Sequence, residues 1–459
     1  MATDYETMSK KKESEIIANI TKRAPEGKRF NVPGQQRYKD EKYSFEKERV
    51  LYNTRVKQFP WIYVDQPVIG SNVQGWGCHE EVGKMFVEWG KKHVYIATTG
   101  LRGSGLIDEM ESVLKQAGLA CTIGPFTHSN PRTTDIAAGV KVYKEAGCDA
   151  VLSVGGGSSH DTGKGMRFEL ANPGKTVQDA HAILDPHWME ATKVFNYIDT
   201  PQIAVNTTCG TGAEITPFAV MTNWEKRWKF NIMAKYPLGG LEPKLGYNDP
   251  AFFRTMPEHI AAQTGIDTMV HGLGGWLSRL NNQAARAVGM MACKMCFENL
   301  PEFATNRWND VAAENMCWAQ HLGAMTYALG GGVGMIHAIA HQISAVNDMH
   351  HGLANAIPMV PVVRYMVPAA AERLAVLGRN AFGLDITGKT RFQGADMFVD
   401  TLERFRNDVG ITDVHLGTYG ITEEEAFQMA KHGVNDLNME GSPRDITEPE
   451  LYDFIVGLI

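Results

Sequence analysis

The chain has 459 residues, a formal net charge of −7 at pH 7 and a hydrophobic content of 44%. Its length allows two or three domains with sizeable cores. Because there is no broad basic stretch, neither nucleic acid nor an anionic membrane surface is an expected partner. No apolar run reaches the ~20 residues that span a bilayer, and the N-terminus lacks the hydrophobic segment of a signal peptide, so a cytoplasmic protein is expected.

The seven cysteines are odd in number and scattered along the chain. This pattern predicts reduced thiols rather than a disulfide framework. Cys293 and Cys296 form a lone C-x-x-C in a helix-like stretch, with no second pair to complete a zinc site. We interpret them as buried core thiols.

Residues 1–60 are charged and aromatic without a clear core pattern, and we interpret them as an N-terminal extension in which residues 42–59 form an amphipathic helix. Strand-like and helix-like segments alternate farther along the chain. The expected strands are 93–99, 119–124, 149–157 and 201–208, and the expected helices are 104–118 and 135–147. Such alternation predicts a parallel sheet with helices on both faces.

After about residue 250, stretches with apolar residues at helical spacing replace the strand signals, as at 312–330 and 368–383. These stretches predict a second domain built of helices. The sequence therefore predicts an extension over residues 1–60, an α/β domain over 61–250 and an all-α domain over 251–459.

Three glycines, Gly155, Gly156 and Gly157, end the strand expected at 149–157, and Ser158 follows where a helix is expected to begin. Backbone N–H groups at such a turn, with the positive end of a helix dipole, suit the phosphates of a dinucleotide. The segment matches neither G-x-G-x-x-G nor the Walker pattern. A second loop at 207–212 also follows a strand, and two loops at strand ends can enclose one ligand.

Titratable side chains with the spacing of metal ligands lie in the helical half. Asp267 and His271 are four residues apart, as are His337 and His341, so each pair projects from one helix face. His351 follows at a helix end. A lone histidine on an apolar helix is usually a core residue, but burying several titratable groups is costly unless something pairs them. An aspartate oxygen with neutral imidazoles suits Fe(II), Zn or Mn rather than Ca or Mg.

These motifs resemble those of the iron-containing, or group III, alcohol dehydrogenases. GGGSSHD at 155–161 is similar to the family's GGGSxxD, and TTCGTGAE at 207–214 is similar to its TTxGTGSE. The segments DTMVH, IHAIAH and HHGLANA are similar to its metal motifs, and the resemblance runs from about residue 62 to the end. Within the family, TTGLRGSG, HHGLANA and GSPRDIT are most similar to the nicotinoprotein methanol dehydrogenases and formaldehyde dismutases. The extension is not part of the usual family pattern.

The resemblance implies a role for each candidate residue. It implies that Asp267, His271, His337 and His351 bind the metal, and that His341 is the family's non-ligand histidine near the reaction centre. The residues that it implies for the cofactor, besides the strand-end Gly155, are Gly156, Gly157, Ser158, Asp161, Lys164, Thr207, Thr208 and Thr211.

The family's NAD-preferring members often carry aspartate at the end of the first strand, where it binds the ribose 2′-OH. Here Thr98 takes that place, with Arg102 nearby, so NAD and NADP both stay open. Ala213 replaces the more usual serine of the second loop, a change that we expect to be tolerated.

By the same resemblance, the expected activity is reversible hydride transfer between a small primary alcohol, of methanol or ethanol size, and its aldehyde. The expected cofactors are NAD or NADP and Fe(II), with Zn or Mn as alternative metals. Two other activities stay open: reduction of a small polar aldehyde, and a nicotinoprotein oxidoreductase or dismutase with tightly bound cofactor. Relatives imply a homo-oligomer, either a dimer or a decamer.

Some details of the site stay open at this stage. His341 lies one helical turn from His337 and would either relay the alcohol's proton or bond to a ligand or cofactor. Trp276, Phe218 and Met221 lie near site motifs and would either narrow the pocket or belong to the core, while no cationic group for a charged substrate is evident. The complete Asp and three-His set argues against assigning the chain to the related dehydroquinate synthases or glycerol dehydrogenases, because those enzymes carry zinc on fewer ligands. It also argues against a non-catalytic protein that keeps only the fold.

Overall fold

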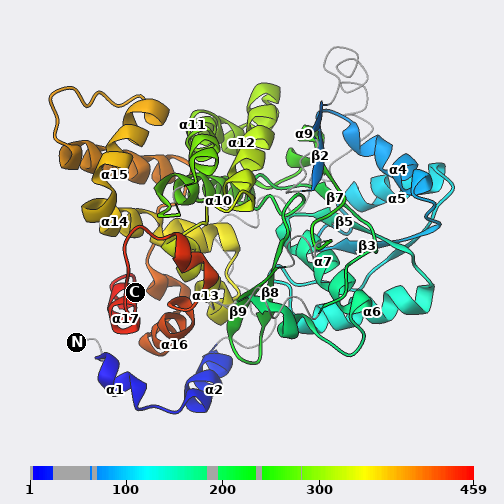
Figure 1. The fold of residues 1–459 in the computed structure, drawn as a ribbon, viewed down its shortest axis with the longest axis horizontal. Helices are drawn as coiled ribbons and strands as arrows, with labels where there is room; N and C mark the ends of the chain where they lie inside the picture. Colours follow the sequence, from blue (N-terminus) through cyan, green and yellow to red (C-terminus); the bar gives the residue numbers. More distant parts are fainter. Residues whose placement is uncertain (1–3, 24–61, 65–69, 183–194, 234–239, 281) are drawn as a thin grey trace.

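The computed structural model describes residues 4–23, 62–64, 70–182, 195–233, 240–280 and 282–459. Figure 1 shows a sheet with its helices on one side of the molecule and a larger group of helices on the other. The helix expected over residues 42–59 lies outside the described residues. The proposed division at residues 60 and 250 stays a prediction.

The main sheet has seven strands in the order β1-β2-β10-β7-β5-β3-β4. Six of them are parallel, and β1 pairs antiparallel with β2 at the edge. The strands are β1 (Ile62–Val64), β2 (Ser71–Gln74), β3 (His93–Thr98), β4 (Ala120–Ile123), β5 (Ala150–Gly155), β7 (Gln202–Asn206) and β10 (Leu245–Asn248). All four strands expected from the sequence are present, and the predicted parallel sheet is confirmed.

Alternate side chains of the central strands enter two different cores, as the period of two in a strand requires. In β3, Val94 and Ile96 pack with α4 (Val82–Glu88) and α5 (Leu106–Gln116) on one face. Tyr95 and Ala97 pack on the other face with α6 (Thr133–Ala146) and α7 (Gly157–Ala171). Helices therefore cover both faces of the sheet, as predicted (Figure 1).

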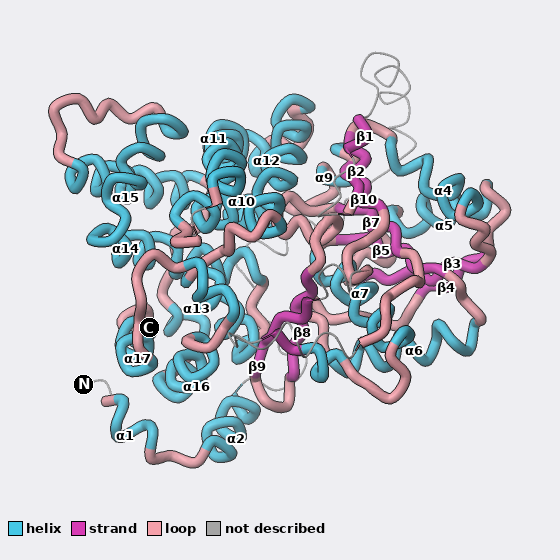
Figure 2. The backbone as a smooth tube through the Cα atoms, in the orientation of Figure 1, coloured by secondary structure: helices cyan, strands magenta, loops and turns pink. Residues whose placement is uncertain are grey.

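A second, smaller sheet lies between the main sheet and the C-terminal helices (Figure 2). It is antiparallel, in the order β6-β9-β8, and consists of β6 (His181–Ala182), β8 (Phe218–Asn223) and β9 (Trp228–Met233). Met221 of β8 enters the core formed with α6 and α7, while β9 contacts α13. The small sheet therefore links the two halves of the protein.

From residue 250 on, the described chain contains helices and no strands, as the apolar spacing predicted. Helices α10, α11, α12 and α14 pack together in a large apolar core with α13, α15, α16 and α17. These elements are α9 (Pro250–Phe253), α10 (Glu258–Leu277), α11 (Gln283–Thr305), α12 (Asp310–Ala328), α13 (Met335–Asn347), α14 (His351–Phe382), α15 (Arg391–Asp408), α16 (Glu423–Gly433) and α17 (Glu448–Val456).

The predicted state of the cysteines is confirmed, because all seven are free. Cys293 and Cys296 are fully buried in α11 and belong to the helical core. Within the described residues, α14 is long and apolar enough to cross a membrane, although the sequence predicted no such segment. In the most apolar 18-residue stretch of α14, 67% is buried inside the protein, which is the pattern of a core helix.

The start of the chain packs against its end. Helices α1 (Tyr5–Ser9) and α2 (Glu13–Arg23) lie beside α16 and α17 at the lower left of Figure 1. The Tyr5 ring contacts Phe427 and Tyr452, with ring centroids 5.5 and 5.8 Å apart. Lys11 pairs with Glu424 at 2.8 Å. This part of the predicted extension is therefore docked on the helical half.

Candidate active site

Three helices bring the four predicted metal ligands together. Asp267 and His271 lie on α10, His337 lies on α13, and His351 begins α14. Ligand atoms of Asp267, His271 and His337 all lie within 4.8 Å of one another. The Nε2 atoms of His337 and His351 lie 3.3 and 3.6 Å from Asp267 Oδ1. Four side chains from three different helices thus surround one small volume.

The electrostatics of this cluster suit a divalent transition metal. Burial lowers the pKa of His271 to about 4 and holds the pKa of His337 and His351 well below the usual range. All three imidazoles are therefore neutral near pH 7, which is the form that binds metals. Burial raises the pKa of Asp267, and Asn355 Nδ2 donates to its Oδ1 at 2.7 Å.

The cluster also contains polar atoms without partners. His271, His337 and His351 each have a buried Nδ1 with no hydrogen-bond partner among the described residues. Leaving such atoms unpaired costs free energy, whereas a bound ion with ordered water can supply partners. One carboxylate oxygen and three neutral imidazoles form a borderline ligand set that fits Fe(II), Zn or Mn. The residues present therefore fit the metal that the sequence predicted.

The glycine-rich turn lies at the carboxyl end of β5, where α7 begins. Gly155 has a φ of +143°, and a Cβ there would lie 2.2 Å from Ser159 Oγ. A Cβ on Gly156 or Gly157 would meet the side chain of Thr208 or Thr211 at less than 3 Å. The two predicted loops therefore lie against each other, with no room at the turn for larger residues.

The rest of the second loop is held by the sheet. Thr207 N donates to Gly155 O at 3.0 Å, and Thr208 N donates to Asn206 Oδ1 at 3.1 Å. Thr98 ends the neighbouring strand β3 and is buried, with no hydrogen-bond partner for its Oγ1 among the described residues. The side chain of Arg102 donates to Gly124 O. The predicted cofactor residues thus gather at one edge of the sheet.

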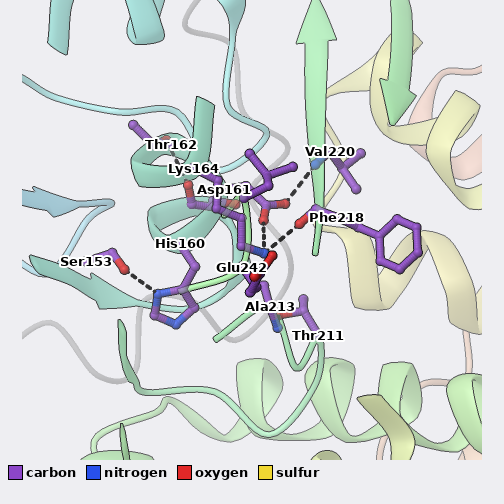
Figure 3. A network of polar contacts seen from close by, with 12 residues as sticks. Ser153, His160, Asp161, Thr162, Lys164, Thr211, Ala213, Phe218, Val220 and Glu242 are labelled. Atoms are coloured by element: carbon purple, nitrogen blue, oxygen red, sulfur yellow. Dashed lines mark hydrogen bonds and ion pairs between the residues drawn. The ribbon is translucent and has the colours of Figure 1, made fainter. Parts of the chain in front are cut away.

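Asp161 and Lys164 join α7 to the small sheet (Figure 3). Lys164 Nζ donates to Asp161 Oδ1 at 3.1 Å and to Phe218 O at 2.5 Å. Asp161 Oδ2 accepts from Val220 N at 2.9 Å. Lys164 is fully buried, so its side chain fixes β8 against α7, whereas Asp161 also lines a cavity.

That cavity has a volume of about 420 Å³ and lies between the glycine-rich turn and the metal cluster. Its wall contains eight of the predicted site residues: Gly157, Ser158, Asp161, Thr211, His271, His337, His341 and His351. The remaining predicted residues are not part of this wall: Thr98, Gly155, Gly156, Lys164, Thr207, Thr208 and Asp267. Of the bulky residues expected to narrow it, Phe218 lines the cavity, whereas Trp276 donates to Arg373 O and Met221 is a core residue.

Sequence reasoning missed a cation in the cavity wall. Lys229, on β9, donates from Nζ to Asn130 Oδ1 at 2.8 Å, and Asn130 Nδ2 donates to Asp348 Oδ1 at 2.9 Å. Burial lowers the pKa of Lys229 to about 8, and nearby carboxylates such as Asp161 oppose that shift. Nothing in the local sequence marks Lys229, because its position depends on the packing of β9 beside α13.

His341 lines the same cavity and is held from behind by Asp436. The distance from its Nδ1 to Asp436 Oδ2 is 3.0 Å. Its ring centroid lies 6.3 Å from that of His337 and 5.4 Å from that of His351. An imidazole that is not one of the four predicted ligands therefore lies next to them, in reach of a molecule in the cavity.

A dinucleotide-type turn and a cluster of Asp and His side chains that could hold a transition metal face one cavity, which is the arrangement of a metal-dependent oxidoreductase. Comparison with known proteins identifies the family. Residues 70–238 match the model of the iron-containing alcohol dehydrogenases, and residues 261–456 match the C-terminal model of the same family. The chain belongs to the iron-containing alcohol dehydrogenase family and is an alcohol oxidoreductase.

Several named relatives have similar sequences. The chain is 32% identical over 375 residues to methanol:N,N-dimethyl-4-nitrosoaniline oxidoreductase of Rhodococcus erythropolis, covering 80% of this chain and 83% of the relative. It is 29% identical over 386 residues to NAD-dependent methanol dehydrogenase of Bacillus methanolicus, covering 84% and 97%. A crystal structure of 1,3-propanediol oxidoreductase is 30% identical, with a TM-score of 0.77, covering 87% of this chain and all of that one. The predicted resemblance to the family near its methanol dehydrogenase branch is confirmed.

Proposed function

We propose that the protein oxidises a small primary alcohol reversibly to its aldehyde, with NAD or NADP as hydride acceptor. The observation that carries the proposal is the shared cavity, which His271, His337 and His351 line on one side and Gly157, Ser158 and Thr211 line on the other. Asp267, His271, His337 and His351 would hold the metal, with Fe(II) as the first candidate. A relative at 29% identity is named as an NAD-dependent methanol dehydrogenase, which supports both the nucleotide and the size of the alcohol.

The two loops would hold the nucleotide through backbone groups. The N-terminus of the 15-residue α7, with the backbone N–H groups of Gly156 and Gly157, suits its phosphates. Thr207, Thr208, Thr211 and Asp161 would contact it from the neighbouring elements, with Lys164 fixing Asp161 from behind. Thr98 in place of an acidic residue leaves both nucleotides acceptable at the strand end.

When bound, the metal would lower the pKa of the alcohol hydroxyl, and the oxidised nicotinamide would take up the hydride. The side chains of the protein have the other tasks. Phe218 and Tyr327 line the cavity and help to exclude water from the substrate carbon. His341, whose Nδ1 faces Asp436, would accept the hydroxyl proton at Nε2.

The direct test is to purify the protein without added cofactor and to measure its metal content and any released nucleotide. The same sample is then assayed with short alcohols and aldehydes and with NAD(H) and NADP(H). We expect about one metal per chain, exchangeable nucleotide and turnover of a short primary alcohol. Absence of both metal and nucleotide binding, with no turnover, would refute the proposal.

A second candidate function is favoured by the relative that is named methanol:N,N-dimethyl-4-nitrosoaniline oxidoreductase. In that case the nucleotide would stay bound and an external acceptor would recycle it. Bound nucleotide after purification, with turnover on the nitroso acceptor and none on added NAD, would establish this alternative.

Reduction of a small polar aldehyde is the same chemistry in reverse, and the cation of Lys229 in the cavity wall would favour a polar substrate.

We also propose that the protein works as a cytoplasmic homo-oligomer, either a dimer or a decamer. Edge strand β1 and the exposed Trp308 and Val311 on the helical half offer surfaces for a second copy. Light scattering of the purified protein would give the subunit number.

A further inference from the structure

A second cavity lies behind the histidine that faces the substrate. It has a volume of about 160 Å³, and its wall includes His181, Trp228, His432 and Asp436. Lys229, Asn231 and Leu437 line both this cavity and the larger one, so the two spaces are neighbours separated by single side chains. We call this space the rear cavity.

Asp436 connects the rear cavity to His341. Its Oδ2 lies 3.0 Å from His341 Nδ1 and accepts a longer bond, of 3.4 Å, from Gln342 Nε2. Its Oδ1 accepts from Asn438 N at 2.9 Å, which caps the short 3-10 helix Leu437–Gly441. Both oxygens are therefore held, and the carboxylate position is fixed by α13 and by the 3-10 helix Leu437–Gly441.

The contact between Asp436 and His341 decides which nitrogen of the ring carries hydrogen. A carboxylate accepts hydrogen bonds, so Nδ1 donates and Nε2 keeps its lone pair for the cavity that His341 lines. Asn438 Nδ2 also lies 3.3 Å from this Nδ1, a longer approach than that of Asp436. Without the carboxylate, the ring would lose both its orientation and its preferred tautomer.

We propose that Asp436 is a positioning residue for His341, and that the alcohol's proton leaves the site through Asp436 into the rear cavity. This inference rests on the proposed function. The hydroxyl O–H bond breaks and its proton binds His341 Nε2, while the Nδ1 proton moves to Asp436 Oδ2 and then to water in the rear cavity. The carbon-bound hydrogen would leave separately as hydride, which a nicotinamide nucleotide held by the loops at 155–158 and 207–211 would accept, so protons and electrons balance.

The surroundings of Asp436 support a route for protons rather than a site for a cation. Lys229 is near it on β9, and His181 and His432 face the rear cavity from β6 and α16. His432 Nε2 lies 2.8 Å from Gln428 Nε2, and Trp228 packs against both histidine rings. Water in this cavity would have several polar partners, which a buried water requires.

The first test is Asp436→Asn, which keeps the shape of the side chain and one oxygen for the cap. We expect kcat to fall about 10- to 100-fold while KM for the alcohol changes less than about threefold. The matched control is Asp135→Asn, because Asp135 also bonds a histidine, His128 Nδ1 at 2.9 Å, and caps a helix, but His128 is not in the cavity wall. An unchanged kcat in Asp436→Asn, or an equal loss in the control, would overturn the proposal.

The second test uses Asp436→Ala with added formate. Removal of the carboxylate leaves a space next to the rear cavity, and formate is a carboxylate small enough to enter it. We expect formate to restore at least about a tenth of the kcat of the wild-type protein, with saturation and without stimulating that protein. Failure of formate to act on a folded, metal-containing Asp436→Ala protein would refute the exit through the rear cavity.

A third measurement does not depend on turnover. Imidazole ¹⁵N shifts of the zinc-loaded protein report which nitrogen of His341 carries hydrogen. We expect hydrogen on Nδ1 in the wild-type protein and a mixture of tautomers in Asp436→Asn. The same tautomer in both proteins would refute the positioning role, whereas absence of alcohol turnover in the wild-type protein would count against the proposed function alone.

Discussion

Gly352 offers a sharp test of how the metal cluster is built. It follows the proposed ligand His351 at the start of α14 and packs on the backbone of α10, which carries Asp267 and His271. A Cβ at Gly352 would lie 2.1 Å from Gln263 O, which falls short of an ordinary 3.4 Å contact by about 1.3 Å. The atoms nearest to that Cβ belong to the backbone of Gln263 and Thr264, so Gly352→Ala must push α14 away from α10.

A shift of that size is large for a metal site, where ligand distances are held to about 0.2 Å. We expect Gly352→Ala to lower metal affinity at least about tenfold and the free energy of unfolding by about 1–3 kcal/mol. Metal content after purification and calorimetric titration of the apoprotein with zinc would measure the first effect. Urea unfolding of the apoprotein would measure the second.

The control is Gly323→Ala on α12, which also lies beside a ligand. A Cβ there would lie 3.4 Å from His271 Cβ, an ordinary contact, so the helix can accept alanine without moving. We expect Gly323→Ala to keep the metal affinity of the wild-type protein. Equal affinities in all three proteins would show that the contact between α14 and α10 does not set the geometry of the ligands.

Three further predictions concern catalysis, pH and the start of the chain. His341→Ala should lower kcat about 100-fold with unchanged metal content, because a positioned acid–base group is lost; equal activity would exclude the relay. Burial lowers the pKa of His321 to about 4, so the unfolded chain binds its proton first, and stability should fall as pH drops from 6.5 to 4. Urea unfolding of His321→Gln should show a shallower loss over that range, and an identical slope would contradict the assignment. Ile16→Ala and Ile20→Ala should each cost about 2–5 kcal/mol, because both side chains are fully buried. If truncation at these two positions leaves the urea midpoint unchanged, the extension does not stabilise the fold.

The sequence predicted those parts of the site that depend on local spacing. Asp267 and His271, one turn apart on a helix, have a fixed relation whatever surrounds them. The glycines at 155–157 are similarly local, because the strand before them and the helix after them are both evident in the sequence. For the same reason the parallel sheet and the helical second half were predictable.

Residues that join the site through tertiary packing were not predictable. Lys229 bonds Asn130, which lies 99 positions earlier, and Asp436 bonds His341, which lies 95 positions earlier. Each is an ordinary residue in its own segment, and its role depends on how β9 and the chain after α16 pack against α13. Met221 and Trp276 lie close to site motifs in the sequence but do not line the cavity, because Met221 is buried in the core between α6, α7 and the small sheet and Trp276 packs against the helical core.

The docking of α1 and α2 has a consequence for biosynthesis. Tyr5 bonds Glu448 across 443 positions of chain, so during synthesis α1 and α2 lack these partners until α16 and α17 have been made. During that time Met8, Ile16 and Ile20 remain exposed to other chains and to chaperones. Synthesis of α16 and α17 is therefore the event that allows α1 and α2 to be buried, and a protein truncated before α16 would expose the apolar side chains of α1 and α2.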